Sequence, residues 1–271
     1  MSRNRIRFIP IFFVILLSFS VCLAESTDAA APAEIKDGLI KGSKIGLAKS
    51  IVYRCIIQPD ARDFVLIGLE GSGMNPRSDG SGITWNKGLQ DYNVIDFSIA
   101  NELSEWNDKK RSKANDIYSA AVISAVLENY GHVKTAGLFA FSKGACGADS
   151  VFRGLEEEGF RVLFVWLADP FTAHEMPSIM QAVEDSRIML YNRYSKKKRL
   201  SVYGKEIGEK YGELPNVDSS FVSVSHGGLL KYSTFTEELL GAIDMAITGS
   251  DPAAYKVAEE AEADPAPEDT P

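Results

Sequence analysis

The sequence predicts an α/β protein with a mostly parallel β-sheet and helices on both faces of that sheet. The first observation is that several apolar runs, such as DFVLIGL (63–69) and RVLFVWLA (161–168), are continuous rather than alternating. Continuous runs rich in β-branched residues are typical of strands that are buried on both faces. The second observation is that stretches with helical spacing separate these runs. This order of elements indicates a parallel sheet covered by helices.

Three strands are expected in the first part of the chain: SIVYRCIIQ (50–58), DFVLIGL (63–69) and YNVIDFS (92–98). The first two are separated by Pro59-Asp60, which is a turn signal. A helix is expected over 113–130, because apolar residues such as Ile117, Ala120 and Ala121 recur there at helical spacing.

Strands and helices alternate in the rest of the chain. Four more strands are expected: TAGLFAF (135–141), RVLFVWLA (161–168), RIMLYN (187–192) and SFVSVS (220–225). Helices are expected over 143–158, 174–184 and 234–247, and Pro177 is compatible with the second because it falls in the first turn. Residues 192–217 form a long excursion that could cover the site. A sheet of this kind places its ligand site outside the carboxyl ends of the strands, so functional residues should follow the strands directly.

The two ends of the 271-residue chain are expected to lie outside the folded domain, which is expected to span 44–248. Residues 1–24 combine three arginines, an apolar run from Ile9 to Val21 and a terminal Ala24, a pattern typical of a cleaved secretory signal peptide. The alternatives are an uncleaved anchor and lipid attachment at Cys22. Residues 25–43 are interpreted as a linker and 249–271 as a disordered acidic tail. The protein is therefore expected to be exported, to the periplasm or the medium.

The charge balance argues against a nucleic-acid partner. The chain has 29 basic and 37 acidic side chains, and its first 24 residues hold three arginines and no acid. A mature chain would therefore carry 26 basic against 37 acidic groups, a net charge of −11. Binding to phosphates needs clustered Lys and Arg. The one basic cluster, Lys196 to Arg199, is interpreted as a solvated loop, with contact to an anionic membrane as the alternative.

Two cysteines, Cys55 and Cys146, remain after removal of the signal peptide. An oxidising compartment permits a disulfide between them. Each also lies in an apolar or small-residue stretch that suits a buried free thiol. Both interpretations stay open at this stage.

Ser142 is the candidate nucleophile. It follows the strand 135–141 within AFSKGACGA (140–148), where nearly every neighbour is small. A serine on a sharp turn from strand to helix is held in a strained backbone conformation and projects its hydroxyl above the sheet. Side chains two residues before and two residues after it would collide, which explains Ala140 and Gly144. The alternative is that Ser142 only caps a helix.

Asp169 and His226 are the candidate acid and base. Asp169 directly follows the strand 161–168, where a carboxylate could orient a histidine. His226 directly follows the expected strand 220–225, within reach of Ser142. The alternatives are a loop aspartate before proline and an exposed loop histidine. Other acids and histidines are less well placed. Asp149 lies inside an expected helix, and three residues precede strands: Asp185, Asp218 and His132. His174, at the start of an expected helix, is the weaker candidate for the base.

These motifs, in the order Ser142, Asp169, His226, resemble those of the α/β-hydrolase superfamily over about residues 44–248. LIGLEGSGMN (66–75) resembles the strand and glycine-rich oxyanion loop of that family, with Glu70 where histidine is usual. AFSKGA resembles its nucleophile elbow, with alanine in place of the first glycine. The resemblance implies an α/β-hydrolase-like fold and an oxyanion hole formed by the backbone N–H groups of Ser72 and Lys143.

The sequence therefore predicts an exported serine hydrolase of the carboxylesterase or lipase type, acting on a small-molecule or lipid ester through an acyl-enzyme. No cofactor is expected, and the scattered histidines and cysteines do not have the spacing of a metal site. The alternative is a secreted binding protein that keeps the hydrolase scaffold without turnover, for which Glu70 in the oxyanion loop is the argument.

Overall fold

The computed structural model describes residues 32–59, 63–77, 82–104, 108–171, 176–195, 202–231 and 234–249. The predictions made for the signal peptide, the acidic tail from residue 250, His174 and the basic cluster Lys196 to Arg199 concern residues outside these ranges. None of the helices within these ranges is long and apolar enough to cross a membrane.

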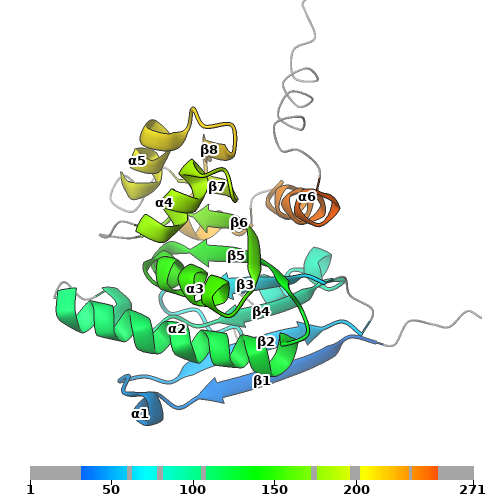
Figure 1. The fold of residues 1–271 in the computed structure, drawn as a ribbon, viewed down its shortest axis with the longest axis vertical. Helices are drawn as coiled ribbons and strands as arrows, with labels where there is room; N and C mark the ends of the chain where they lie inside the picture. The colour runs from blue at the N-terminus through cyan, green and yellow to red at the C-terminus, as the bar shows by residue number, and fades with distance from the viewer. Residues whose placement is uncertain are drawn as a thin grey trace, which may run out of the picture. The chain divides into compact units, whose positions relative to one another are not determined.

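An eight-stranded sheet forms the centre of the fold, with the order β1-β2-β4-β3-β5-β6-β7-β8 (Figure 1). The strands are β1 (Glu34–Ile40), β2 (Ile51–Ile57), β3 (Val65–Leu69), β4 (Asn93–Phe97), β5 (Thr135–Phe141), β6 (Arg161–Ala168), β7 (Met189–Tyr194) and β8 (Val217–Phe221). β1 and β2 pair antiparallel with their neighbours, and the strands from β4 to β8 are all parallel. The predicted mostly parallel sheet is confirmed.

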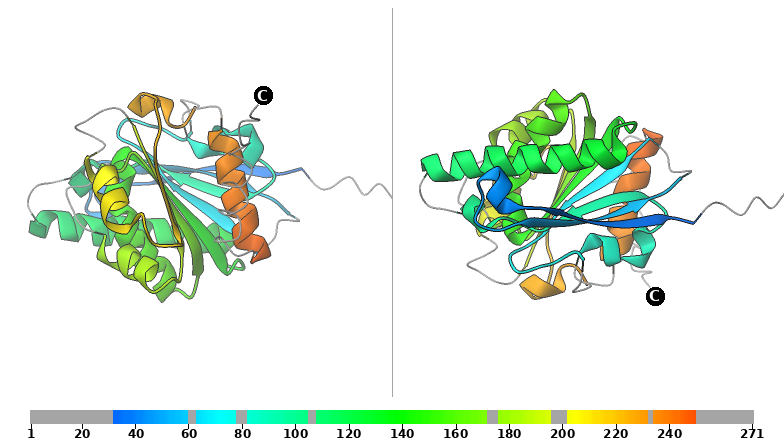
Figure 2. Two further views of the ribbon diagram at one scale, coloured as in Figure 1. Left: turned by 90° about the horizontal axis from the view of Figure 1, so that it is seen from above. Right: turned by 90° about the horizontal axis from the view of Figure 1, so that it is seen from below.

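Helices cover both faces of this sheet, as predicted. The helices are α1 (Gly42–Ile45), α2 (Asp108–Tyr130), α3 (Ala145–Glu157), α4 (Pro177–Glu184), α5 (Val202–Tyr211) and α6 (Phe235–Thr248). Buried side chains of α2, α3, α4 and α5 join one apolar cluster, and those of α6 join a second cluster on the other face. Figure 2 shows α6 on the opposite side of the sheet from α2, α3 and α4.

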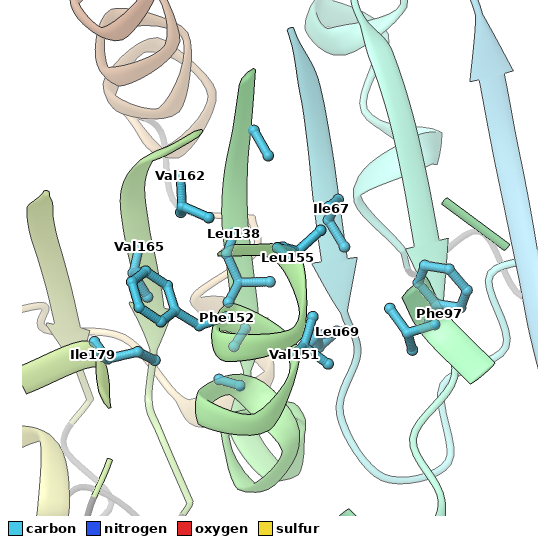
Figure 3. Close-up of a cluster of buried hydrophobic side chains, with 14 of the residues drawn as sticks. Ile67, Leu69, Phe97, Leu138, Val151, Phe152, Leu155, Val162, Val165 and Ile179 are labelled. Carbon is cyan, nitrogen blue, oxygen red and sulfur yellow. The ribbon is translucent and has the colours of Figure 1, made fainter. Parts of the chain in front are cut away.

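The larger apolar cluster fixes the helix that follows the predicted nucleophile. Val151, Phe152 and Leu155 project from α3 onto Leu138 of β5 and Val165 of β6, and all five are fully buried (Figure 3). Burial of a side chain of this size contributes about 1.5–3 kcal/mol. The start of α3 is therefore held firmly against the carboxyl end of β5.

Residues 34–43 differ from the linker interpretation, because Glu34–Ile40 forms β1 and the folded part of the chain begins earlier than predicted. β1 pairs with β2 over its whole length, and Gly38 lies flat against the ring of Tyr53, where a Cβ would come within 1.9 Å of a ring carbon. β1 is an edge strand and all seven of its residues are at least partly exposed. It therefore lacks the apolar run that marks the buried strands.

Two further elements differ from the sequence interpretation in the carboxyl-terminal part. The last strand is Val217–Phe221 rather than 220–225, and Val222 and Val224 pack against the second apolar cluster instead of extending the strand. Within the predicted excursion 192–217, residues 202–211 form α5. Gly204 of α5 lies close to Pro170, so this helix packs beside the loop that follows β6.

Candidate active site

Ser142 lies at the junction of β5 with a short 3-10 turn, η5 (Ser142–Gly144), that leads into α3. Its φ is +52°, in the left-handed region, and the residue is 7% exposed. A Cβ on Gly144 would lie 1.9 Å from the carbonyl oxygen of Leu69 at the end of β3. The elbow is therefore so close to the neighbouring strand that only glycine fits, which is the physical reason for the small residue predicted there.

Asp169 follows β6 directly and is fully buried, with a φ of +46°. Its backbone N–H donates to the carbonyl oxygen of Arg193, 2.7 Å away on β7. Its carboxylate accepts a hydrogen bond from the N–H of Ser195 at 3.1 Å and another from the Ser195 hydroxyl at 2.6 Å. Three donors, including His226, thus converge on this carboxylate.

The pKa of Asp169 reflects two opposing effects. Burial raises it, whereas hydrogen bonds from His226 and Ser195 and the electrostatic interaction with His226 lower it. The hydrogen bonds and the interaction with His226 outweigh the effect of burial, so the pKa lies below its ordinary value and the carboxyl is ionised at neutral pH.

His226 connects the other two side chains. Its Nδ1 lies 2.6 Å from Oδ2 of Asp169, and its Nε2 lies 2.9 Å from Oγ of Ser142. An ionised carboxylate can only accept, so Nδ1 donates to it, and in the neutral imidazole Nε2 is then the acceptor for the hydroxyl proton of Ser142. The imidazole stacks on the ring of Phe141, with the ring centres 4.9 Å apart.

The route of the chain to His226 differs from the prediction. The residue opens a 3-10 turn, η6 (His226–Gly228), and residues 222–225 separate it from the end of β8, so it does not follow its strand directly. Val222 N–H donates to the carbonyl oxygen of Tyr194, which holds the intervening loop beside the end of β7. The sequence nevertheless identified the three residues that the structure brings into hydrogen-bond contact.

Two contacts tie the loop after β6 to the elbow. The N–H of Phe171 donates to the carbonyl oxygen of Ser142 at 2.9 Å, and the thiol of Cys146 donates to the carbonyl oxygen of Phe171 at 2.9 Å. Cys146 and Cys55 are both free and buried, so the disulfide left open by the sequence is not formed. Burial raises the pKa of Cys146 to about 11, against the effect of the positive charges of Lys143 and Arg111.

The residues predicted for the oxyanion hole lie on two adjacent segments. Ser72 is exposed in the turn after β3, and Lys143 is half-buried in η5. Among the described residues, neither N–H donates a hydrogen bond to another backbone group outside the helices and strands. Their role stays a prediction.

Glu70 has a structural environment that the sequence did not indicate. It is fully buried, its N–H donates to the carbonyl oxygen of Phe97, and its carboxylate accepts from the N–H of Ile83 at 3.0 Å. These contacts tie the start of the glycine-rich loop to β4 and to the turn η2 (Ile83–Trp85). They give Glu70 a function in the fold that does not require a ligand.

Sequence reasoning missed Arg193, which lies near the end of β7, and Ser195, which directly follows that strand. Neither residue is part of a recognisable motif. Arg193 is buried and forms ion pairs with Asp218 at 2.7 Å and Glu238 at 2.8 Å, while its carbonyl oxygen accepts from Asp169. Asp218 was set aside as a candidate acid, and its carboxylate is indeed engaged with Arg193. The only sequence signal for Ser195 is its place directly after β7.

Structural comparison identifies the fold. An esterase of Pyrococcus furiosus superposes with a TM-score of 0.52 at 16% identity, over 80% of this chain and 91% of that chain. A CIB-like hydrolase from Thermoplasma acidophilum superposes with a TM-score of 0.51 at 12% identity, over 79% of this chain and 99% of that chain. The predicted α/β-hydrolase-like fold is confirmed. Comparison of the sequence with family models and with curated proteins finds no match.

Proposed function

We propose that the protein is an exported serine hydrolase that cleaves a carboxylic ester, with Ser142 as nucleophile, His226 as general base and acid, and Asp169 as the acid that orients the histidine. The observation that carries this proposal is the pair of hydrogen bonds at His226, 2.6 Å to Asp169 and 2.9 Å to Ser142. A nucleophile and base within hydrogen-bond reach, with the base oriented by a third group, is the arrangement required for nucleophilic catalysis.

In the first half of the reaction, Oγ of Ser142 attacks the carbonyl carbon of the ester as its proton passes to Nε2 of His226. The bond to the alcohol then breaks, and His226 returns the proton to the departing alcohol oxygen. Water then attacks the acyl carbon as one of its protons passes to Nε2 of His226. The bond between that carbon and Oγ of Ser142 breaks, and His226 returns the proton to Oγ as the carboxylic acid leaves. Asp169 stays ionised and stabilises the imidazolium that forms twice in this cycle.

The negative charge on the attacked carbonyl oxygen needs donors during both halves. The N–H of Lys143, which adjoins the nucleophile, and the N–H of Ser72 in the loop after β3 are proposed to supply them. Support comes from the contact of Gly144 with the end of β3, because it brings the elbow and that loop to the same point of the sheet.

A small-molecule ester is the proposed substrate class, and the name esterase carried by the Pyrococcus furiosus protein agrees with it. A lipid ester is the related alternative, for which the basic cluster Lys196 to Arg199 is proposed to contact an anionic membrane surface. Export is proposed from the signal-like residues 1–24. Amino-terminal sequencing of the protein recovered from the periplasm or medium should begin at Glu25.

Labelling with a fluorophosphonate tests the activity, because only an activated serine reacts quickly with it. We expect stoichiometric labelling of Ser142, no labelling of Ser142→Ala, and loss of p-nitrophenyl butyrate hydrolysis by about 10⁶-fold in that variant. Ser220→Ala, which removes the hydroxyl of a serine in β8, is the matched control. A folded protein that neither labels nor hydrolyses would refute the proposal and favour a binding protein on the same scaffold.

A further inference from the structure

Ser195 contacts the Asp169 carboxylate with both its backbone and its side chain. It follows β7 directly, is 2% exposed, and gives both of its donors to Asp169. The N–H contacts Oδ1 at 3.1 Å and the hydroxyl contacts Oδ2 at 2.6 Å. One residue therefore donates a hydrogen bond to each oxygen of the carboxylate, which fixes the plane of the carboxylate.

The oxygen Oδ2 of Asp169 is shared. It accepts from the Ser195 hydroxyl and from Nδ1 of His226, each at 2.6 Å. A second donor on this oxygen withdraws electron density from the bond to the imidazole. The hydroxyl of Ser195 thus acts on His226 through the carboxylate and without touching it.

The charged groups around this carboxylate are few in the described residues. From η6, His226 faces it directly. From β7, Arg193 contributes only its carbonyl oxygen to the Asp169 amide, because its guanidinium is engaged with Asp218 and Glu238. From the elbow, the ammonium of Lys143 lies over the ring of Phe171, 5.9 Å from its centre. Ser195 is therefore the main neutral group that sets the proton affinity of the Asp169–His226 pair.

We propose that Ser195 is a positioning residue of the ester hydrolysis: it holds the Asp169 carboxylate in the orientation that binds His226 and limits how tightly that pair holds a proton. This inference rests on the proposed serine hydrolase function. Without the hydroxyl, the carboxylate keeps the N–H of Ser195 and Nδ1 of His226 as donors and becomes more basic. The imidazolium of His226 is then held more strongly, so the histidine becomes a free base only at higher pH.

The test is the pH profile of kcat/KM on a soluble neutral ester, measured for Ser195→Ala and for the isosteric pair Ser195→Thr and Ser195→Val. Thr and Val have the same shape and differ in the hydroxyl, so a difference between them does not arise from packing. We expect the acid limb to move up by roughly one pH unit in the Ala and Val variants, since a hydrogen bond to a charged group contributes about that much. Their kcat should fall about tenfold with little change in KM, and the Thr variant should follow the wild type.

Ser219→Ala is the control, because Ser219 accepts from Asn192 on the neighbouring strand and has no contact with Asp169. A lower plateau with an unmoved acid limb, or equal profiles for Thr and Val, would overturn the inference and leave Ser195 with a purely structural role. Failure of the wild type to label with fluorophosphonate would instead refute the proposed function itself. The two failures are therefore distinguishable.

Discussion

Gly144 faces the carbonyl oxygen of Leu69 so closely that a Cβ on it would lie 1.9 Å from that oxygen. Leu69 ends β3, and Gly144 ends the turn that carries Ser142. The contact therefore sets the distance between the nucleophile and the glycine-rich loop that begins at Glu70. Leu69 is fixed in the sheet and Gly144 is fixed at the turn that leads into α3. Neither residue can therefore move away from the contact without disturbing the sheet.

Gly144→Ala should consequently lower both activity and stability. We expect ester hydrolysis to fall by at least about 100-fold, because a misplacement of about 1 Å at the reacting atoms has that effect. The free energy of unfolding should fall by about 1–3 kcal/mol, as for other overpacked sites. Gly159→Ala is the control: its φ is +80° but no atom lies within 4 Å of the new Cβ, so it should reduce stability and leave activity intact. Equal activity of the two variants would contradict the prediction.

The sequence predicted those parts of the fold in which a single strand can be recognised from its own residues, without knowledge of its neighbours. β3, β5 and β6 have continuous apolar runs. Ser142 and Asp169 directly follow β5 and β6, so a parallel sheet places both residues at the same edge. β1 was missed because an edge strand needs no apolar run. The fold was predicted from these strands, whereas the catalytic roles of Ser142, Asp169 and His226 remain predictions.

Ser195 was missed for a different reason. Its importance lies in the tertiary contact of the ends of β6 and β7, which brings a residue 26 positions away onto the Asp169 carboxylate. A serine after a strand has many possible partners, and nothing in its neighbours selects one. The same holds for Cys146, whose thiol contacts the loop after β6.

Asp169→Asn should reduce kcat by about 10⁴-fold if Asp169 orients His226, since the amide favours the wrong tautomer of the imidazole. The measurement is steady-state hydrolysis of p-nitrophenyl butyrate, with circular dichroism as the check on folding. Asp149→Asn is the control, because Asp149 caps the start of α4 through Ser178 and Ile179 and has no contact with the site. A loss of less than about tenfold in Asp169→Asn would move the acid assignment elsewhere.

The lowered pKa of Asp169 predicts that this residue contributes to the loss of folding stability at acid pH. In the unfolded chain an aspartate titrates near pH 3.9, whereas in the native protein it stays ionised to lower pH. Stability from this group is present above the unfolded value and is lost as the pH falls through the native one. Chemical unfolding between about pH 5 and pH 3 should therefore show a shallower pH slope for Asp169→Asn than for the wild type or for the surface variant Glu213→Gln. Parallel slopes would contradict this prediction.

The two buried thiols should be unreactive in the native protein. Burial raises the pKa of Cys55 to about 12 and that of Cys146 to about 11, so the thiolate is scarce at pH 8. We expect Ellman's reagent to modify neither residue within minutes at pH 8, and to modify both in guanidinium chloride, as read from peptide masses. Fast native labelling of Cys146 would show that the loop after β6 opens readily.

The carboxylate that orients His226 should be transferable from the end of β6 to the end of β7. Because the Ser195 hydroxyl and Nδ1 of His226 contact the same oxygen of Asp169, a carboxylate at position 195 should reach the space that the Asp169 carboxylate vacates. Asp169→Gly is the suitable vacating change, since glycine adopts the φ of +46° without strain and keeps the N–H bond to Arg193.

Asp169→Gly alone should lose about 10⁴-fold in kcat, and adding Ser195→Asp should restore at least about tenfold. Adding Ser195→Asn in its place supplies the same shape without the charge, so it should restore nothing. The imidazolium needs an anion at Nδ1, and only the aspartate provides one. If the doubly changed protein with aspartate folds, as judged by thermal unfolding, yet is no faster than Asp169→Gly, then the end of β7 is too far from His226 to orient it.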